Sequence, residues 1–223
     1  MSSSCNKESC WLKHKCIKEG LDKSIIDNTF APKQPLEWKK KPNEWLSSVD
    51  IQKVMKQYEK AYKCFEFLGP SPIDFDDHKL YGECVWEELC KFNLTDFLKR
   101  NKTKIGIIFN LDKHTQSGSH WVGMFINTKR KEITYMDSYG DLAPKEVNEL
   151  AERILKQSET IGTPYEYNTT SLRHQYSNSE CGMYCLYFII ESVKGKDWKY
   201  FNKKKISDKK MKKLRNIYFN VNN

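Results

Sequence analysis

Two cysteines lie four residues apart in the segment QYSNSECGMYCLYFIIES, which runs from Gln175 to Ser192. The residues after Cys181 are apolar on every face of a helix, a pattern typical of a buried helix. Cys181 falls in the first helical turn, where free N–H groups and the helix dipole favour an anion. Cys185 lies one turn deeper, where desolvation favours the neutral thiol. We therefore expect Cys181 to be a nucleophile and Cys185 to be a packed core residue.

The residues that precede this helix add to the predicted site. Ser177 and Glu180 have the spacing of a capping box at the helix start. Gln175 carries an amide donor which, together with the Cys181 backbone N–H, can form a two-donor oxyanion hole. Gly182 allows a substrate or a neighbouring backbone to approach closely.

A base and its orienting carboxylate come from a predicted hairpin, formed by the strands HWVGMFIN (120–127) and KEITYMD (131–137). A symmetric hairpin that pairs Ile126 with Lys131 places His120 directly opposite Asp137. Facing residues have Cβ atoms roughly 4.5–5.5 Å apart, so the carboxylate can hold one ring N–H and leave the other nitrogen as a base. A polar pair on a solvated face is the alternative interpretation, and a one-residue bulge would destroy the register.

A thiol at a helix start, a base, an orienting carboxylate and an oxyanion donor are the groups that acyl transfer requires. His174 is a second candidate for the base because it lies close in sequence, but it lacks an evident orienting carboxylate. His78 and His114 fall in loops, and we expect both to be surface residues.

The remaining sequence predicts the elements that position these groups. We expect a helix over 49–61, capped by Ser47 or Ser48, then an irregular loop in FEFLGPSPIDFDD and one or two helices in GECVWEELCKFNLTDFLKR. A strand over 104–111, a helix after Pro144, a short strand in TPYEYNTT and basic C-terminal helices follow. Helices, then adjacent strands, then helices indicate an α+β fold with an antiparallel or mixed sheet. Residues 1–40, which include APKQP, are predicted as an N-terminal arm and 41–223 as one domain.

The composition excludes several classes of protein. No apolar run reaches the roughly 20 residues that cross a bilayer, and no secretory signal is evident at the N-terminus. We therefore expect a reducing cytosolic or nuclear location, with the 8 cysteines mostly free thiols. The spacing of Cys5, Cys10, His14 and Cys16 fits no common zinc pattern, so neither a metal nor a cofactor is expected.

The net charge of +9 is concentrated in the block KKKP and in residues 194–215. A solvated lysine face explains such a segment, as does an electrostatic contact with nucleic acid or an acidic partner. The segment has few arginines and no aromatic stacking motif, which argues against base-specific recognition.

These residues together resemble the cysteine protease family that processes ubiquitin-like proteins and includes the adenovirus protease adenain. The resemblance extends from about Asn43 to Val193 and rests on four motifs: Trp45-Leu46-x4-Ile51, His120-Trp121, Tyr135-x-Asp137-Ser138 and Gln175-x5-Cys181-Gly182. It implies a papain-like, adenain-type fold, with a mixed or antiparallel sheet packed on the buried helix that carries the nucleophile.

The resemblance also implies a role for each matching residue. Cys181 would be the nucleophile, His120 the base, Asp137 its orienting carboxylate and Gln175 the oxyanion donor. Trp121 would line the substrate channel, with Gly182 a further substrate-binding candidate.

The chain departs from the family at two places. Glu180 stands where the family usually has Asp before the nucleophile, and it is expected to cap the helix about as well. The N-terminal arm has no counterpart in the minimal cellular proteases.

Within the family, EWLSSVDIQKVMKQYEKAY and FEFLGPSPIDF resemble the polyprotein-processing proteases of large cytoplasmic DNA viruses, of the African swine fever virus type. This implies cleavage after Gly-Gly sites and maturation of structural polyproteins during virion assembly, in the host cytoplasm and the virion. A deconjugase of ubiquitin-like modifiers is the alternative. A basic nucleic-acid-associated protein with an incidental thiol, and an acetyl-CoA-dependent acyltransferase, are further hypotheses.

Overall fold

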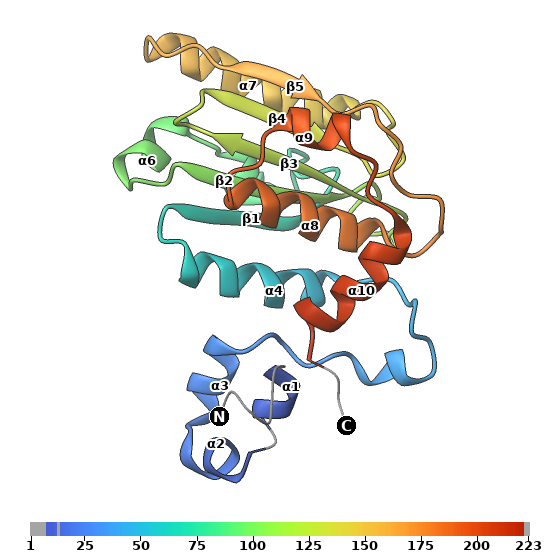
Figure 1. The fold of residues 1–223 in the computed structure, drawn as a ribbon. Coiled ribbons are helices and arrows are strands. Elements are labelled where there is room, and N and C mark those ends of the chain that lie inside the picture. Colours follow the sequence, from blue (N-terminus) through green and yellow to red (C-terminus); the bar gives the residue numbers. More distant parts are fainter. Residues whose placement is uncertain (1–7, 13, 221–223) are drawn as a thin grey trace.

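The structure is a computed structural model that describes residues 8–12 and 14–220 (Figure 1). Its centre is a five-stranded sheet in the order β1-β2-β3-β4-β5, with strands Phe65–Pro72, Lys104–Asn110, Trp121–Asn127, Glu132–Met136 and Glu166–Thr169. β1 is parallel to β2 and β4 to β5, whereas the pairs β2–β3 and β3–β4 are antiparallel. The predicted α+β class with a mixed sheet is confirmed.

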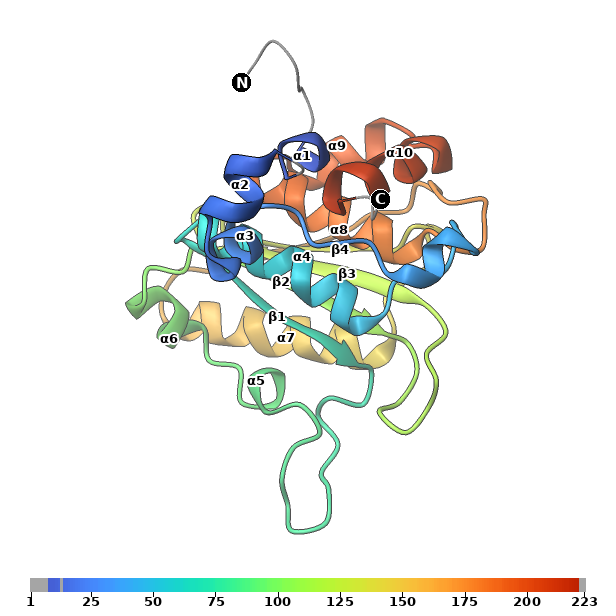
Figure 2. The ribbon, with the colours of Figure 1, turned by 90° about the horizontal axis from the view of Figure 1, so that it is seen from below.

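The sheet has a hydrophobic core on each face, because successive side chains of a strand point to opposite sides. In β2, Ile105, Ile107 and Phe109 pack in the cluster that includes helix α7 (Lys145–Thr160), and Ile108 packs in the cluster that includes α8 (Cys181–Val193). Figure 2 shows α7 on one side of the sheet and α8 on the other. The helix with the two cysteines is therefore central and buried, as predicted.

Two strand glycines let α8 lie close to the sheet. A Cβ at Gly106 would lie 2.8 Å from Ile189 Cγ2, and one at Gly123 would lie 2.9 Å from Phe188 Cδ1. Both distances are shorter than side-chain contacts allow, so a larger residue at either position would force Ile189 or Phe188 to move. The two glycines thus let α8 pack closely against β2 and β3.

Helix α4 (Ser48–Ala61) shares the core cluster of α8. Its N-cap is Ser47, whose hydroxyl accepts the Asp50 N–H at 3.2 Å, while the Asp50 carboxylate accepts the Ser47 N–H at 2.9 Å. The predicted helix and cap are confirmed, and a full capping box accounts for the abrupt start.

The prediction of an irregular loop at FEFLGPSPIDFDD is wrong, because Phe65–Pro72 forms strand β1. β1 lies at the edge of the sheet and pairs with β2 alone, with a register shift between Leu68 and Ser71. Prolines are tolerated in edge strands and at bulges, where the missing N–H needs no partner. Pairing with β2 thus outweighs the local preference of Pro70 and Pro72 for irregular structure.

Two short helices, α5 (Glu87–Cys90) and α6 (Leu94–Lys99), follow as predicted, and Asn93 caps the second of them. The expectation of mostly free thiols is wrong in this region, since Cys84 and Cys90 form a disulfide. Cys10 is also disulfide-bonded, whereas Cys64, Cys181 and Cys185 are free.

The N-terminal segment contains the short helices α1 (Glu8–Trp11), α2 (Lys15–Gly20), α3 (Lys23–Thr29) and η1 (Leu36–Lys39). The proline-containing stretch that we expected to be an arm or linker packs against the C-terminal end. Asn220 donates its N–H to the Pro32 carbonyl and accepts the Gln34 N–H, both at 2.8 Å. The partner is almost two hundred residues away in the chain, which the local pattern cannot reveal. The division at residue 40 remains a prediction.

The chain closes with α9 (Trp198–Lys203) and α10 (Asp208–Tyr218), the predicted basic helices. Among the described residues, no helix has the length and apolar character needed to span a membrane.

Candidate active site

The hairpin that supplies the base differs from its predicted register. β3 and β4 pair Ile126 with Ile133 and Asn127 with Glu132, which leaves a loop over 128–131. The pairing is therefore displaced by two residues from the predicted pair of Ile126 with Lys131. His120 does not lie directly opposite Asp137 as expected. The register, continued beyond the last paired residues, places Tyr139 opposite His120.

His120 and Asp137 are nevertheless joined across this open end of the hairpin. His120 precedes β3 and Asp137 follows β4, and His120 Nε2 lies 2.8 Å from Asp137 Oδ1. The same carboxylate oxygen accepts the Tyr139 backbone N–H at 2.9 Å. Asp137 is buried, so this carboxylate holds the imidazole in a largely water-free position.

Cys181 is the first residue of α8, as predicted, and its side chain is one of the groups that raise the pKa of the His120 ring. Because Nε2 faces Asp137, Nδ1 is the ring nitrogen left for the sulfur. Burial alone would lower the pKa of His120, but hydrogen bonds to Asp137 and Cys181, and their negative charges, raise it to about 9. The site thus favours the protonated, imidazolium form of His120 beside the Asp137 carboxylate.

Cys185 lies one turn further along the same helix and is fully buried. Desolvation raises the pKa of this thiol well above its usual range, and the nearby charges of Cys181 and Asp137 act in the same direction. Cys185 is therefore a neutral, packed thiol, in agreement with the prediction.

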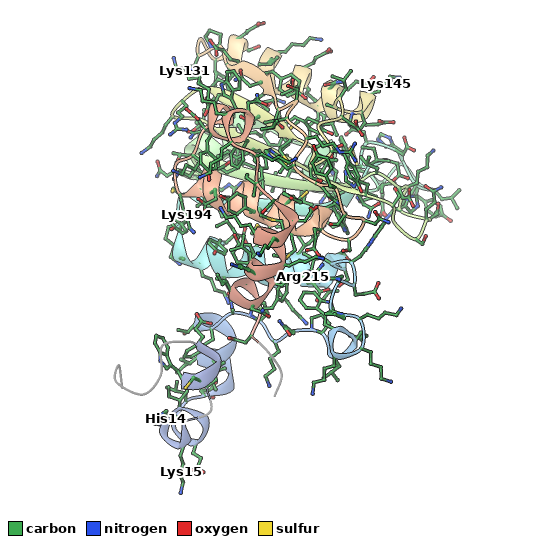
Figure 3. All side chains as sticks on the ribbon, turned by 45° about the vertical axis from the view of Figure 1, so that its right-hand side comes forward. His14, Lys15, Lys131, Lys145, Lys194 and Arg215 are labelled. Atoms are coloured by element: carbon green, nitrogen blue, oxygen red, sulfur yellow. A yellow bond between two sulfur atoms is a disulfide. The ribbon has the colours of Figure 1, made fainter. Side chains whose placement is uncertain are left out.

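The start of α8 is held differently from the prediction. Glu180 occupies the N-cap position, but its side chain makes no capping hydrogen bond, so the proposed capping box with Ser177 is wrong. The buried Glu180 carboxylate instead accepts from Arg215 Nε of α10 at 3.0 Å. Arg215, labelled in Figure 3, also lies over the Trp38 ring at 4.4 Å from its centroid.

This ion pair replaces the expected cap because α10 brings a cation to the helix start. Both partners are almost completely buried, with exposed side-chain fractions of 4% and 0% for Arg215 and Glu180. Removal of either partner would leave an unpaired buried charge, at a cost of roughly 3–5 kcal/mol. The residue before Cys181 is thereby fixed by a contact with the C-terminal helix.

Gln175 is buried beside His120 and Cys181, and hydrogen bonds orient its side-chain amide. The side-chain carbonyl of Gln175 accepts from Ser138 Oγ at 2.7 Å. Its Nε2 donates to the Ser177 backbone carbonyl at 2.6 Å and lies 3.3 Å from Tyr139 Oη. The amide has two N–H groups, so one remains for Tyr139 or for an oxyanion. The structure thus brings Gln175 into the site with His120, Asp137 and Cys181.

Tyr139 contacts three of these four residues, and the sequence analysis missed it. Its ring stacks on His120 at a centroid distance of 4.9 Å and an interplanar angle of 19°. Its backbone N–H binds Asp137, and its hydroxyl contacts Gln175. Burial raises the pKa of Tyr139, and the Cys181 charge raises it further. The correct hairpin register would have revealed the residue, because it pairs Tyr139 with His120.

Trp121 and Gly182 both contact Leu46. The Trp121 indole N–H donates to the Leu46 carbonyl at 3.1 Å. A Cβ at Gly182 would lie 3.0 Å from Leu46 Cβ, so the group that approaches this glycine closely is a side chain of the protein. Trp121, Leu46 and Trp45 line one end of a groove of about 640 Å³.

The remaining histidines lie apart from this site. His174 is buried, its Nδ1 accepts the Ile206 N–H at 3.2 Å, and burial lowers its pKa, so it is a core residue rather than the base. His114 is exposed in a loop, as predicted, and its ring binds the buried Asp74. His78 is exposed, as predicted, and its backbone forms an isolated antiparallel β-bridge with Cys84.

Potential metal ligands come together at one place in the described part of the chain. Ligand atoms of His78, Cys84 and Cys90 lie within 4.8 Å of one another, but the two sulfurs are joined as a disulfide. Cys5 and the side chain of Cys16, from the N-terminal group considered above, lie outside the described residues.

Known structures share this fold. The crystal structure of the African swine fever virus pS273R protease superimposes with a TM-score of 0.76 and 23% identity, over 99% of this chain and 85% of that chain. The C-terminal Ulp1 protease domain, solved in complex with Smt3, the yeast ortholog of SUMO, gives a TM-score of 0.52 with 18% identity, over 86% of this chain and 91% of that one. The papain-like α+β protease fold is thus confirmed.

Sequence relatives lead to the same group of proteins. The thiol protease R355 of Acanthamoeba polyphaga mimivirus is 30% identical over 96% of this chain and 70% of its own length. The SUMO-1 cysteine protease S273R of African swine fever virus is 26% identical over 97% of this chain and 84% of its own length. The family model of the Ulp1 protease C-terminal catalytic domain matches residues 51–223. The chain therefore belongs to the Ulp1 protease family and is a cysteine-type peptidase.

Proposed function

We propose that this peptidase is an endopeptidase that cleaves after Gly-Gly sites and matures viral structural polyproteins during virion assembly. The observation that carries the catalytic part is the alignment of Asp137, His120 and Cys181, with the thiol at the first residue of a buried helix. The similarity to proteases of mimivirus and African swine fever virus supports a viral protease, for which a polyprotein substrate and a place in the host cytoplasm and the virion are part of the proposal.

The geometry gives each residue a step in the reaction. The Cys181 thiolate attacks the scissile carbonyl carbon, and its electron pair forms the thioester while the His120 imidazolium gives its proton to the leaving amine. Asp137 holds the imidazole and stabilises its charged form. The neutral imidazole then takes a proton from water, which hydrolyses the acyl-enzyme and frees Cys181.

The negative oxygen of each tetrahedral intermediate requires nearby donors. The Cys181 backbone N–H lies in the first helical turn, where no intrahelical acceptor exists for it. Gln175 Nε2 supplies a second donor when the oxyanion replaces Tyr139 Oη as the partner of its free N–H. The Ser138 hydroxyl, which binds the Gln175 carbonyl, keeps the amide from flipping.

The preference for glycine follows from the shape of the approach to Cys181. Trp45, Leu46 and Trp121 all line the groove, and Leu46 itself packs on Gly182 next to the nucleophile. Bulky apolar side chains next to the nucleophile would favour substrate residues without a side chain at the scissile bond. The preference for glycine would then arise from steric exclusion rather than from charge.

A deconjugase of ubiquitin-like modifiers is the second candidate, and a solved relative that binds Smt3 favours it. Both candidates use the same chemistry and differ only in the substrate. The hypothesis of an incidental thiol is wrong, because the chain is a peptidase. Non-specific contact with nucleic acid remains a proposal for the exposed lysines at 203–205, 209–210 and 212–213.

The test is direct competition between substrates. The protein and its Cys181→Ala variant are incubated with virion polyproteins and with a ubiquitin-like C-terminal probe, and new termini are mapped by mass spectrometry. We expect Cys181-dependent termini after Gly-Gly in the polyproteins and little reaction with the probe. Reaction with the probe alone would favour the deconjugase, and cleavage by the alanine variant would refute both.

A further inference from the structure

A groove lies next to the catalytic residues, since Trp121, the residue after His120, is among those that line it. It has a volume of about 640 Å³ and is lined by residues from the segment before α4, from the end of β1, from the loop before α5 and from the loop between β2 and β3. Apolar side chains form much of its wall, among them Trp45, Pro70, Val85, Trp86 and Trp121. It is large enough to hold several residues of an extended polypeptide.

A second histidine–carboxylate pair lies in this groove. His114 Nδ1 lies 2.7 Å from Asp74 Oδ2, and the His114 backbone N–H donates to Asp74 Oδ1 at 2.9 Å. Asp74 is 6% exposed, whereas the His114 side chain is 41% exposed and lines the groove. One carboxylate oxygen thus holds the His114 backbone and the other holds its ring, and the ring Nε2 is left for a group outside the protein.

The residues that line the groove carry more positive than negative charge. Lys79 and Lys113 line the same groove. Among the described residues that line it, Asp112 is the single acidic side chain, and its Oδ2 already accepts the Gly118 N–H at 3.0 Å. The groove therefore offers two lysines and an oriented imidazole against a single carboxylate, one of whose oxygens accepts a backbone N–H. An acidic ligand is the charge-complementary occupant.

We propose that this groove binds the substrate polypeptide beside its scissile bond and that His114, Lys79 and Lys113 select an aspartate or glutamate there. The inference rests on the proposed function, since Leu46 lines the groove and also packs on Gly182, the residue after the nucleophile. It adds a substrate requirement that the catalytic residues do not impose. His114 acts as a specificity-determining residue, and Asp74 positions it.

Binding can be measured without turnover in the Cys181→Ser variant. The probes are fluorescein-labelled hexapeptides that end in Gly-Gly, with glutamate at one of the four preceding positions and with glutamine or lysine in its place as controls. At low salt we expect the best glutamate peptide to bind roughly 10-fold more tightly than its lysine counterpart, since each exposed charge contact contributes a few-fold. Added salt should reduce this difference.

Charge reversal identifies the groove as the source of the preference. The Lys79→Glu/Lys113→Glu double variant should lose or invert it. The matched control, Lys145→Glu/Lys194→Glu, changes the net charge equally at two exposed lysines away from the groove, labelled in Figure 3, and should keep it. In the groove variant His114→Gln, the glutamate peptide should bind several-fold more weakly and the glutamine peptide should bind as before.

The outcomes separate this inference from the proposed function. Equal binding of the glutamate and lysine peptides, or an unchanged preference in the groove variants, would overturn the acidic specificity. Polyproteins that remain uncleaved by the wild type would overturn the proposed function instead, whatever the peptides show in the binding assay.

Discussion

The protein holds two histidine–carboxylate pairs with almost the same geometry. His120 Nε2 lies 2.8 Å from Asp137, and His114 Nδ1 lies 2.7 Å from Asp74. In each pair the carboxylate is buried and binds a backbone N–H as well as the ring. The difference lies in what the free ring nitrogen meets: the Cys181 thiol at a helix start in the first pair, and an open groove in the second.

The comparison shows that an oriented imidazole does not by itself make a catalytic base. Its chemistry is decided by the third group and by the burial of the ring. The His120 side chain is 14% exposed, and that of His114 is 41% exposed. A nucleophile and limited access to water make the first pair suitable for proton transfer, whereas the second is suited to binding.

Alanine at each histidine gives the largest expected contrast. His120→Ala should lower kcat on the order of 10⁴-fold, because nucleophile and base act as a unit. His114→Ala should leave kcat nearly unchanged and raise KM several-fold. Steady-state kinetics on a cleaved polyprotein fragment measures both, and similar losses of kcat in the two variants would break the distinction.

Asparagine in place of Asp137 or Asp74 tests the same contrast between catalysis and binding at the carboxylates that orient the two histidines. Asp137→Asn should lower kcat roughly 10²- to 10⁴-fold, because the base loses its orientation and the stabilisation of its charge. Asp74→Asn should change KM alone. Circular dichroism and melting temperature serve as the control for folding, since each substitution alters a buried hydrogen bond.

The pH profile sharpens this second prediction. The pKa of His120 is raised to about 9, so the imidazolium persists below pH 9 and is lost above it. Activity of the wild type should therefore fall as the pH rises through 9. In Asp137→Asn the main cause that raises this pKa is gone, and the alkaline limb should move to lower pH. An unmoved limb would mean that Asp137 does not set the charge of His120.

Tyr139 should affect the function of the His120–Asp137 pair and not that of the His114–Asp74 pair, because its ring stacks on His120. Tyr139→Ala should lower kcat roughly 10- to 100-fold through misplacement of the imidazole. Tyr139→Phe keeps the stack and loses the hydroxyl contact with Gln175, so its loss should be only a few-fold. Equal losses in both variants would assign the effect to the hydroxyl rather than to the ring.

The smallest contrast concerns the two cysteines of α8. With limiting iodoacetamide, Cys181 should be alkylated well before Cys185, since burial keeps the Cys185 thiol neutral. Peptide mass spectrometry measures the two sites in one sample. In His120→Ala the alkylation of Cys181 should slow, and labelling of Cys185 first would contradict the assignment of the nucleophile.

Much of the site could be predicted from local patterns. The all-round apolar segment after Cys181 required a buried helix, and the capping residue Ser47 marked the start of α4. His120 and Asp137 were paired from hairpin spacing although the register was two residues off. The pair survived this error because side chains at the open end of a hairpin reach diagonal neighbours.

Contacts between distant segments could not be predicted. Glu180 was expected to cap its helix, but Arg215 of α10 engages its carboxylate. The segment with Pro70 was expected to be a loop, but pairing with β2 makes it a strand. In both cases a partner remote in sequence supplied more stabilisation than the local preference.

The sequence by itself determined which residue types could do the chemistry and which helix had to be buried, because side-chain periodicity and helix-start residues are local properties. Only the tertiary structure decided that Tyr139 stacks on the base, that Arg215 fixes the residue before the nucleophile, and that Asp74 orients a second histidine in the groove. These contacts join elements whose distance in space depends on the packing of the whole sheet, which no local pattern encodes.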